Sequence, residues 1–344
     1  MFESLIGNST AKGQLERLLT AKRVPNALLF AGPDGVGKKL FAFELARAFV
    51  CSQPSDLKSC GICFACMRVG EIIVPKAEKG EEYDRVFFGS HSDVGLVVPF
   101  KRNLRVGSIR ALETEANYRP YEARARFFIV DDADKMNDAA ANALLKTLEE
   151  PPLTSYIVLI TSRPDRLLQT IRSRSQMIRF SPVDTGEIET LLSQKFNFLH
   201  DDAKLASRVS NGSIGRAIGT DLAKFRSARE QLLTVVDYAA CGRGIAEMLQ
   251  IGEQLNDAKN KDDFEENLAI LESIVHDLWL AANGGNLDAL TNFDIVEQIA
   301  AIANRTQPTR PAAWLTEIET MRQNFAININ RKVATDAFFT RMAA

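Results

Sequence analysis

The chain has 344 residues, of which 46% are hydrophobic and 25% are charged, and its formal net charge is −2. This length exceeds what one hydrophobic core usually serves and predicts two or three domains of a soluble globular protein. The small net charge excludes a general attraction to nucleic acid, so any such contact requires a local basic patch. No basic leader is followed by an apolar run, and no run approaches the roughly 20 residues of a membrane span. We expect a cytoplasmic protein with no membrane contact.

Short apolar runs alternate with helix-like segments over the first 180 residues. The runs that we predict to be strands are 27–31, 94–98, 127–130, 156–160 and 177–180. Such short runs between helical segments are typical of a parallel sheet that is buried on both faces. We therefore predict an α/β domain over residues 1–182, built on a parallel five-stranded sheet.

A glycine-rich loop follows the first predicted strand. The segment GPDGVGKK, which begins at Gly32, fits the phosphate-loop pattern G-x-x-x-x-G-K-[S/T] up to its last position. In this pattern Gly32, Gly35 and Gly37 let backbone N–H groups surround a phosphate, and Lys38 reaches the outer phosphates. The hydroxyl that binds Mg²⁺ is replaced by Lys39, whose ammonium cannot ligate a cation. We expect weak binding of ATP or ADP and a defective Mg²⁺ site; a plain glycine turn is the alternative.

Four of the five cysteines are crowded into a short segment. They are Cys51, Cys60, Cys63 and Cys66, with the spacing C-x8-C-x2-C-x2-C. In a reducing compartment such crowding indicates a metal site, and four thiolates complete a tetrahedral structural Zn²⁺ site without a position for water. We predict a structural zinc knuckle over residues 51–66. An iron–sulfur cluster and free thiols are the alternatives.

Two acidic residues follow the third predicted strand. Asp131 and Asp132 come directly after the apolar run FFIV. An acid in this place holds the metal in phosphate-loop enzymes, and in motor proteins a glutamate usually follows it. Asp132 is one methylene shorter than glutamate, and a misplacement of about 1 Å slows catalysis strongly. We expect negligible hydrolysis by the isolated chain; capping of a strand by the two acids is the alternative.

Strand signals end beyond residue 182. We predict a small helical domain over residues 183–238, with a break at 211–215, and a further all-helical domain over residues 239–344. The apolar stripes of the last domain fit either an ordinary core or contacts between subunits.

Taken together, these features resemble the clamp-loader branch of the AAA+ ATPases. The similar segments are NALLFAGP from Asn26, the four-cysteine knuckle, IVDDAD from Ile129, NALLKTLEEPP from Asn142, LITS from Leu159, the triplet Ser-Arg-Ser at 173–175 and GSIGRA from Gly212. The resemblance implies an AAA+ α/β domain followed by a helical lid domain and a collar domain that packs in a ring of subunits.

In the bacterial DNA polymerase III clamp loader, both the ATPase subunit (gamma or tau) and the delta-prime subunit carry such a knuckle. The chain resembles the delta-prime type in Lys39, in Asp132, in the absence of a long tau-like tail and in its ending from Asn330. This implies a heteropentamer with gamma/tau and delta subunits, and an indirect relation to the sliding clamp and primed DNA. A gamma/tau-like motor and an unrelated zinc-bearing NTPase are the alternatives.

The same resemblance implies roles for three further positions. Arg174 corresponds to an arginine finger supplied in trans to ATP on a neighbouring subunit, and Ser175 stands where the family usually has cysteine. Thr161, or the serine after it, corresponds to sensor 1, and Arg216 corresponds to sensor 2. Without the family, Arg174 would be interpreted as an arginine in a surface ion pair.

Overall fold

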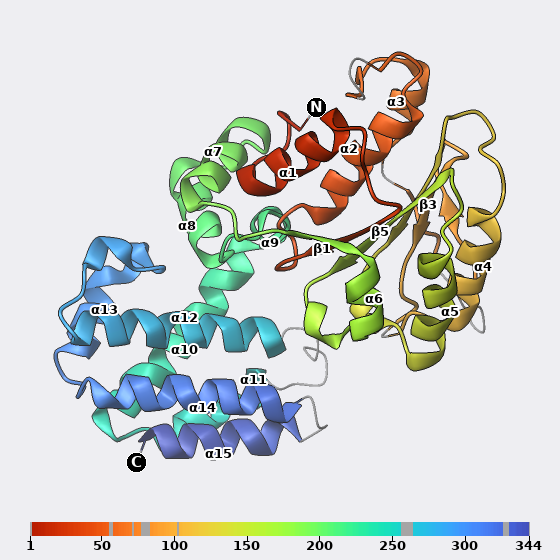
Figure 1. Cartoon of the computed structure of the whole chain (residues 1–344). Coiled ribbons are helices and arrows are strands. Elements are labelled where there is room, and N and C mark those ends of the chain that lie inside the picture. Colours follow the sequence, from red (N-terminus) through yellow and green to blue (C-terminus); the bar gives the residue numbers. More distant parts are fainter. Residues whose placement is uncertain are drawn as a thin grey trace. The chain divides into compact units, whose positions relative to one another are not determined.

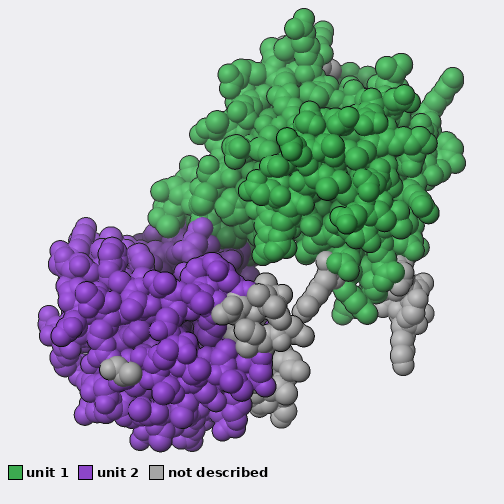
Figure 2. All heavy atoms as spheres, turned by 60° about the horizontal axis from the view of Figure 1, so that its bottom comes forward, with its two compact units in different colours: residues 1–188, 212–215 green, residues 189–211, 216–344 purple. Residues whose placement is uncertain are grey.

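The structure, a computed structural model, describes residues 2–54, 58–70, 72–76, 83–101, 103–255, 264–325 and 330–343. The chain forms two compact units, which are coloured separately in Figure 2. The first unit comprises residues 1–188 and 212–215, and the second comprises residues 189–211 and 216–344. The finer division into domains 1–182, 183–238 and 239–344 stays a prediction.

One six-stranded sheet organises the first unit, in the order β2-β3-β4-β5-β1-β6. Its strands are β1 (Ala27–Ala31), β2 (Phe87–Phe88), β3 (Val94–Val97), β4 (Arg126–Val130), β5 (Ser155–Thr161) and β6 (Gln176–Arg179). All neighbours are parallel except β2, which runs antiparallel to β3. Each predicted apolar run forms one of the parallel strands, but the predicted total of five strands was wrong. The additional strand, β2, has two residues, and so short a segment leaves no periodic pattern in the sequence.

Helices cover both faces of this sheet (Figure 1). The helices of the first unit are α1 (Ser9–Thr20), α2 (Lys38–Val50), α3 (Phe64–Arg68), α4 (Val106–Ala116), α5 (Asp138–Glu149) and α6 (Gln169–Arg174), with short 3₁₀ helices η1 (Ala133–Lys135) and η2 (Pro164–Arg166). Alternate strand residues face opposite layers: Leu28 and Phe30 pack in one core with α1 and α2, whereas Leu29 packs in the other with α4, α5 and α6. This double burial explains why each strand is a continuous apolar run.

The second unit is built from helices around one hydrophobic core, and its described residues contain no strand. Its helices are α8 (His200–Val209), α10 (Leu222–Cys241), α11 (Ile245–Leu255), α12 (Phe264–Ala282), α13 (Val296–Ala303), α14 (Thr309–Phe325) and α15 (Arg331–Ala343), with η4 (Leu287–Ala289) and η5 (Phe293–Ile295). The division between the units falls within α7 (Thr185–Lys195) and α9 (Ile214–Gly219). The prediction of a helical C-terminal portion is therefore confirmed. None of the helices in the described ranges has the length and apolar character needed to cross a bilayer.

Candidate phosphate-binding and metal sites

The glycine-rich loop connects β1 to α2, as a phosphate loop requires. Gly35 has a φ of +74°, and a Cβ at this position would lie 2.1 Å from Ser213 Oγ. The Gly215 N–H donates a hydrogen bond to the Gly35 carbonyl oxygen at 2.9 Å. At the start of the loop, a Cβ on Gly32 would lie 2.3 Å from the carbonyl oxygen of Phe180. Glycine is therefore needed here for packing between two backbone segments, whether or not a phosphate is bound.

Helix α2 begins directly after this loop, at Lys38, and no described side chain caps its first turn. The first backbone N–H groups of a helix have no partner within the helix and carry a partial positive charge. Together with the curled loop, they form a cradle whose chemistry suits a phosphate group. The residues present therefore fit the phosphates of a nucleotide.

Lys38, the lysine of the phosphate-loop pattern, folds back onto its own loop. Its Nζ donates hydrogen bonds to the carbonyl oxygens of Gly32 and Pro33, at 2.5 and 2.6 Å. The side chain is buried, and this burial lowers the pKa of its ammonium group, against the opposing charges of Asp34, Asp131 and nearby carboxylates. A phosphate would have to draw the ammonium away from these two carbonyl groups.

Lys39 makes the most informative contact of the site. Its Nζ lies 2.5 Å from Oδ2 of Asp131, which follows β4 directly. In phosphate-loop enzymes, the hydroxyl at the position of Lys39 and the acid at the position of Asp131 together hold Mg²⁺. Here one ligand is missing and the other is already paired with an ammonium. The residues present therefore do not fit Mg²⁺.

The other polar groups near the ends of β4 and β5 also pair within the chain. Lys135 Nζ lies 2.7 Å from Oδ2 of Asp132. Thr161, the last residue of β5, donates its hydroxyl to Oδ1 of Asp134 at 2.6 Å and accepts a hydrogen bond from the Arg163 N–H at 2.9 Å. Each of the predicted site residues Asp132 and Thr161 thus has a partner that the sequence motifs did not identify.

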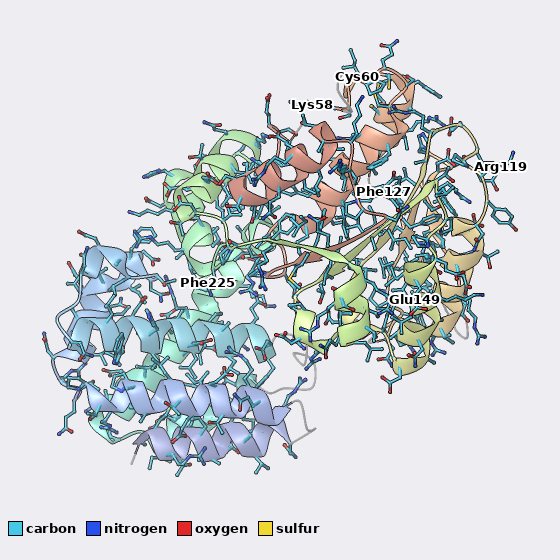
Figure 3. All side chains as sticks on the ribbon, viewed as in Figure 1. Lys58, Cys60, Arg119, Phe127, Glu149 and Phe225 are labelled. Atoms are coloured by element: carbon cyan, nitrogen blue, oxygen red, sulfur yellow. The ribbon has the colours of Figure 1, made fainter. Side chains whose placement is uncertain are left out.

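The four clustered cysteines have the geometry of a metal site. Their sulfur atoms all lie within 4.8 Å of one another. Cys51 Sγ is 3.6 Å from Cys60 Sγ and 3.9 Å from Cys63 Sγ. Four sulfurs at about 2.3 Å from a central Zn²⁺ would be about 3.8 Å apart in a tetrahedron. Figure 3 shows Cys60 beside α3, at the margin of the first unit.

The surroundings of the sulfur atoms favour a bound cation. The backbone N–H groups of Cys60, Cys63 and Cys66 each donate to the sulfur of the preceding cysteine in the cluster, at 3.3–3.5 Å. A hydrogen bond with Ser52 lowers the pKa of Cys63 to about 5, whereas burial raises the pKa of Cys66. A cation would remove the proton from such a buried thiol. The four residues could therefore hold a metal ion.

The cluster is remote from the phosphate loop. Cys51 follows the last residue of α2, whereas Lys38 and Lys39 open that helix. A helix of 13 residues is about 20 Å long. A metal ion in the cluster would therefore support the fold of the knuckle rather than contact phosphates at the other end of α2.

Arg174 lies at the amino ends of the parallel strands, which we call the amino edge of the sheet. The phosphate loop lies at their carboxyl ends, the carboxyl edge. Arg174 ends α6, just before β6, and β6 is parallel to β1. The loop follows the carboxyl end of β1, whereas Arg174 precedes the amino end of β6. The four residues of β6 span about 13 Å at roughly 3.3 Å per residue. Arg174 therefore does not belong to the phosphate site of its own chain.

The guanidinium of Arg174 is partly exposed, and its partners among the described residues lie at the surface. It lies 2.9 Å from Oε1 of Glu149, which is labelled in Figure 3 at the end of α5, and it donates to the Thr170 carbonyl oxygen at 3.2 Å. The side chains of Arg174 and Glu149 are 37% and 51% exposed. An exposed ion pair of this kind contributes roughly 0–1 kcal/mol. The guanidinium could therefore exchange Glu149 for another anion at small cost.

The predicted site residues thus fall into four places. Gly32, Gly35, Gly37, Lys38, Lys39, Asp131, Asp132 and Thr161 gather at the carboxyl edge of the sheet; Arg174 lies at the amino edge; the cysteines lie beyond the far end of α2; and Arg216 belongs to the second unit. There Arg216 lines a cavity of about 580 Å³ together with Glu265, Glu266 and Arg322, among other residues. This charged lining was missed by the sequence analysis, because its residues come from separate helices and form no motif.

Comparisons with known proteins agree along most of the chain. A family model described as DNA polymerase III, delta subunit, matches residues 7–184, just over half of the chain. The DNA polymerase III subunit delta-prime of Escherichia coli (strain K12) is 30% identical over 317 residues, which cover 91% of this chain and 87% of that protein. The delta-prime subunit of Bacillus subtilis (strain 168) is 30% identical over 277 residues, which cover 80% and 78%.

Gamma/tau subunits are similar over a smaller part. That of Mycobacterium bovis is 32% identical over 217 residues, which cover 62% of this chain and 35% of that protein. Among solved structures, a gamma-subunit-related protein from Thermotoga maritima is 18% identical, with a TM-score of 0.40 over 96% of this chain and all of that one. Since the family model and the long matches to delta-prime subunits agree, the chain belongs to the family of DNA polymerase III delta-prime subunits.

Proposed function

We propose that this chain works in the cytoplasm as the delta-prime subunit of a clamp loader, and that Arg174 acts in trans on ATP held by a neighbouring gamma/tau-type subunit. The relatives that match over most of their length are delta-prime subunits of DNA polymerase III. In this proposal the chain is a stator within a heteropentamer of gamma/tau, delta and delta-prime subunits. Its contact with the sliding clamp and primed DNA is indirect.

The position of Arg174 is the observation that carries this proposal. The residue lies at the edge of the sheet opposite its own phosphate loop, and its side chain is 37% exposed. A guanidinium placed against a γ-phosphate stabilises the charge that develops during transfer, and such fingers raise rates by about 10³–10⁵. Lysine would be a poor substitute because it lacks the planar fork of donors. Arg174 is thus suited to act on a neighbour and not on its own loop.

The pairing of charges at the carboxyl edge supports the other half of the proposal. Lys39 pairs with Asp131, Asp132 pairs with Lys135, and Thr161 donates to an acid. A motor would need Asp131 to hold Mg²⁺ and an acid at position 132 to polarise the attacking water. We therefore propose that the isolated chain binds ATP or ADP weakly and hydrolyses it negligibly. Thr161 and Arg216, the sensor positions, have no catalytic role in this proposal.

The remaining parts of the chain receive structural roles. We propose that Cys51, Cys60, Cys63 and Cys66 hold one structural Zn²⁺, because their sulfur spacing suits a closed tetrahedral site. We also propose that the AAA+ α/β domain of residues 1–182 is followed by a lid domain over residues 183–238. Residues 239–344 would then form the collar that joins this subunit to the others.

Reconstitution of the clamp loader with variants of this chain tests the trans role. We expect Arg174→Ala to slow hydrolysis at the adjoining ATP site by about 10³-fold or more, while the five-subunit particle still forms. Arg172→Ala is the matched control, because Arg172 lies on the same helix and pairs with exposed Asp165. An unchanged single-turnover rate in the Arg174 variant would refute the assignment.

The competing function, an ATP-hydrolysing gamma/tau-like subunit, is tested on the isolated chain. Sustained ATP hydrolysis without partner subunits, abolished by Lys38→Ala, would favour that function over ours. An unrelated zinc-bearing NTPase would be indicated if the chain hydrolysed ATP and formed no particle with clamp-loader subunits.

A further inference from the structure

We propose that the ammonium of Lys39 takes the place of Mg²⁺ at the phosphate loop, so that this chain binds nucleotide di- or triphosphates in their metal-free form. The inference rests on the weak nucleotide binding included in the proposed function, but not on the role of Arg174. It concerns the disagreement between a loop that suits phosphates and a metal site in which one ligand is missing and the other, Asp131, is paired with an ammonium.

The position of the ammonium carries the inference. Lys39 stands in the first turn of α2, at the place of the usual hydroxyl ligand, and its Nζ lies 2.5 Å from Oδ2 of Asp131. In phosphate-loop enzymes Mg²⁺ bridges this acid and the phosphates. A positive group in contact with the acid is therefore retained here, but it is part of the chain.

The same contact opposes a divalent cation. The carboxylate of Asp131, 18% exposed, is neutralised by Lys39, and the next acid, Asp132, is paired with Lys135. A Mg²⁺ ion bound to Asp131 would have to displace the ammonium or lie next to it, and like charges repel at such distances. Magnesium therefore gains nothing from this site and competes with the chain for the nucleotide.

Lys39 retains the capacity to bind a phosphate. An ammonium has three N–H donors, and the contact with Asp131 requires one of them. The side chain is 45% exposed, and it lies beside the uncapped first turn of α2. A phosphate in the loop could thus accept from backbone N–H groups and from Lys39, while Lys39 keeps its contact with Asp131.

Calorimetric titration of the isolated chain with ADP, with EDTA or with excess Mg²⁺, tests this inference. We expect wild type to bind ADP at least as tightly in EDTA as in Mg²⁺. In Lys39→Thr, which restores the usual hydroxyl, we expect the preference to reverse, with binding about tenfold tighter in Mg²⁺ than in EDTA. Lys39→Met is the matched control, since it removes the ammonium without adding a ligand, and it should bind weakly in both conditions.

A second variant keeps the inference testable if Lys39→Thr does not fold. Asp131→Asn leaves Lys39 in place and removes its anionic partner, so we expect ADP binding in EDTA to become tighter. Thermal unfolding with and without ADP gives an independent readout of binding. The inference is overturned if wild type requires Mg²⁺ for binding, if Lys39→Thr shows no change in metal dependence, or if no ADP binds in either condition. None of these outcomes affects the trans role of Arg174, because that role is measured on the neighbouring subunit.

Discussion

At the carboxyl edge of the sheet, the ammonium of Lys39 lies 2.5 Å from Asp131, whose side chain is 18% exposed. At the amino edge, the guanidinium of Arg174 pairs with Glu149, whose side chain is 51% exposed. The first cation is directed to an acid of its own site, and the second is held by a surface contact that is easily replaced. A residue of a motif can thus be present while its functional group is already occupied, as the carboxylate of Asp131 is by Lys39. What matters for function is whether the partner of each charge is buried or is exposed and easily replaced.

Removal of the metal is expected to have the largest effect, and it tests whether the two ends of α2 are independent. We expect Cys60→Ser combined with Cys63→Ser to reduce the metal content from one zinc ion per chain to none, because two sulfurs cannot close a tetrahedral site. Elemental analysis of the purified chain measures this. If ADP binding survives the loss of metal, the phosphate loop does not depend on the knuckle. Full metal retention by the variant would contradict the site.

A buried arginine at the amino edge provides the contrast to Arg174. Arg126, the first residue of β4, is fully buried, lies 2.8 Å from a carboxylate oxygen of Glu115 and contacts the aromatic rings of Phe88 and Phe128. We expect Arg126→Met to destabilise the chain by about 3–5 kcal/mol, because it leaves the buried carboxylate of Asp93 without its cation. Urea denaturation measures the change. A loss below about 1 kcal/mol would show that burial does not separate the two arginines.

The ion pair between Lys39 and Asp131 should contribute less to the stability of the chain than Arg126 does. We expect Lys39→Met to destabilise the isolated chain by about 1–2 kcal/mol, because Asp131 is mostly buried and loses its partner, while Lys39 itself is half exposed. Lys135→Met is the matched control, since its partner Asp132 is 34% exposed against 18% for Asp131, and it should change stability by about 0.5 kcal/mol or less. Equal effects of the two variants in thermal unfolding would remove the distinction between the pairs.

The smallest change in stability is expected for the surface ion pair of Arg174 and Glu149. Arg174→Ala and Glu149→Gln should each change the stability of the isolated chain by about 0.5 kcal/mol or less, because both side chains are exposed. This result would separate a role in trans from a role in folding. A large loss of stability in Arg174→Ala would instead make Arg174 a structural residue, and the comparison of the two edges would fail.

Local patterns were sufficient to predict much of the molecule. The five parallel strands, the loop between β1 and α2, the cysteine cluster and the helical C-terminal portion follow from apolar runs, glycine positions and residue spacing. Each of these signals lies within a short stretch of chain, where periodicity and backbone preference act directly. The defect at Lys39 was also visible, because a single residue departs from an otherwise complete pattern.

Tertiary structure decided which of these residues have partners. The pairs of Lys39 with Asp131 and of Thr161 with Asp134 join segments that are far apart in the sequence. The distance between Arg174 and the phosphate loop follows from the parallel pairing of β6 with β1. Strand order and register are set by packing of the whole sheet, and no local pattern contains them. For this reason the sequence alone determined that a glycine-rich loop fits the phosphate-loop pattern except at one metal ligand, and only the fold showed that an ammonium contacts the acid at the position of the other.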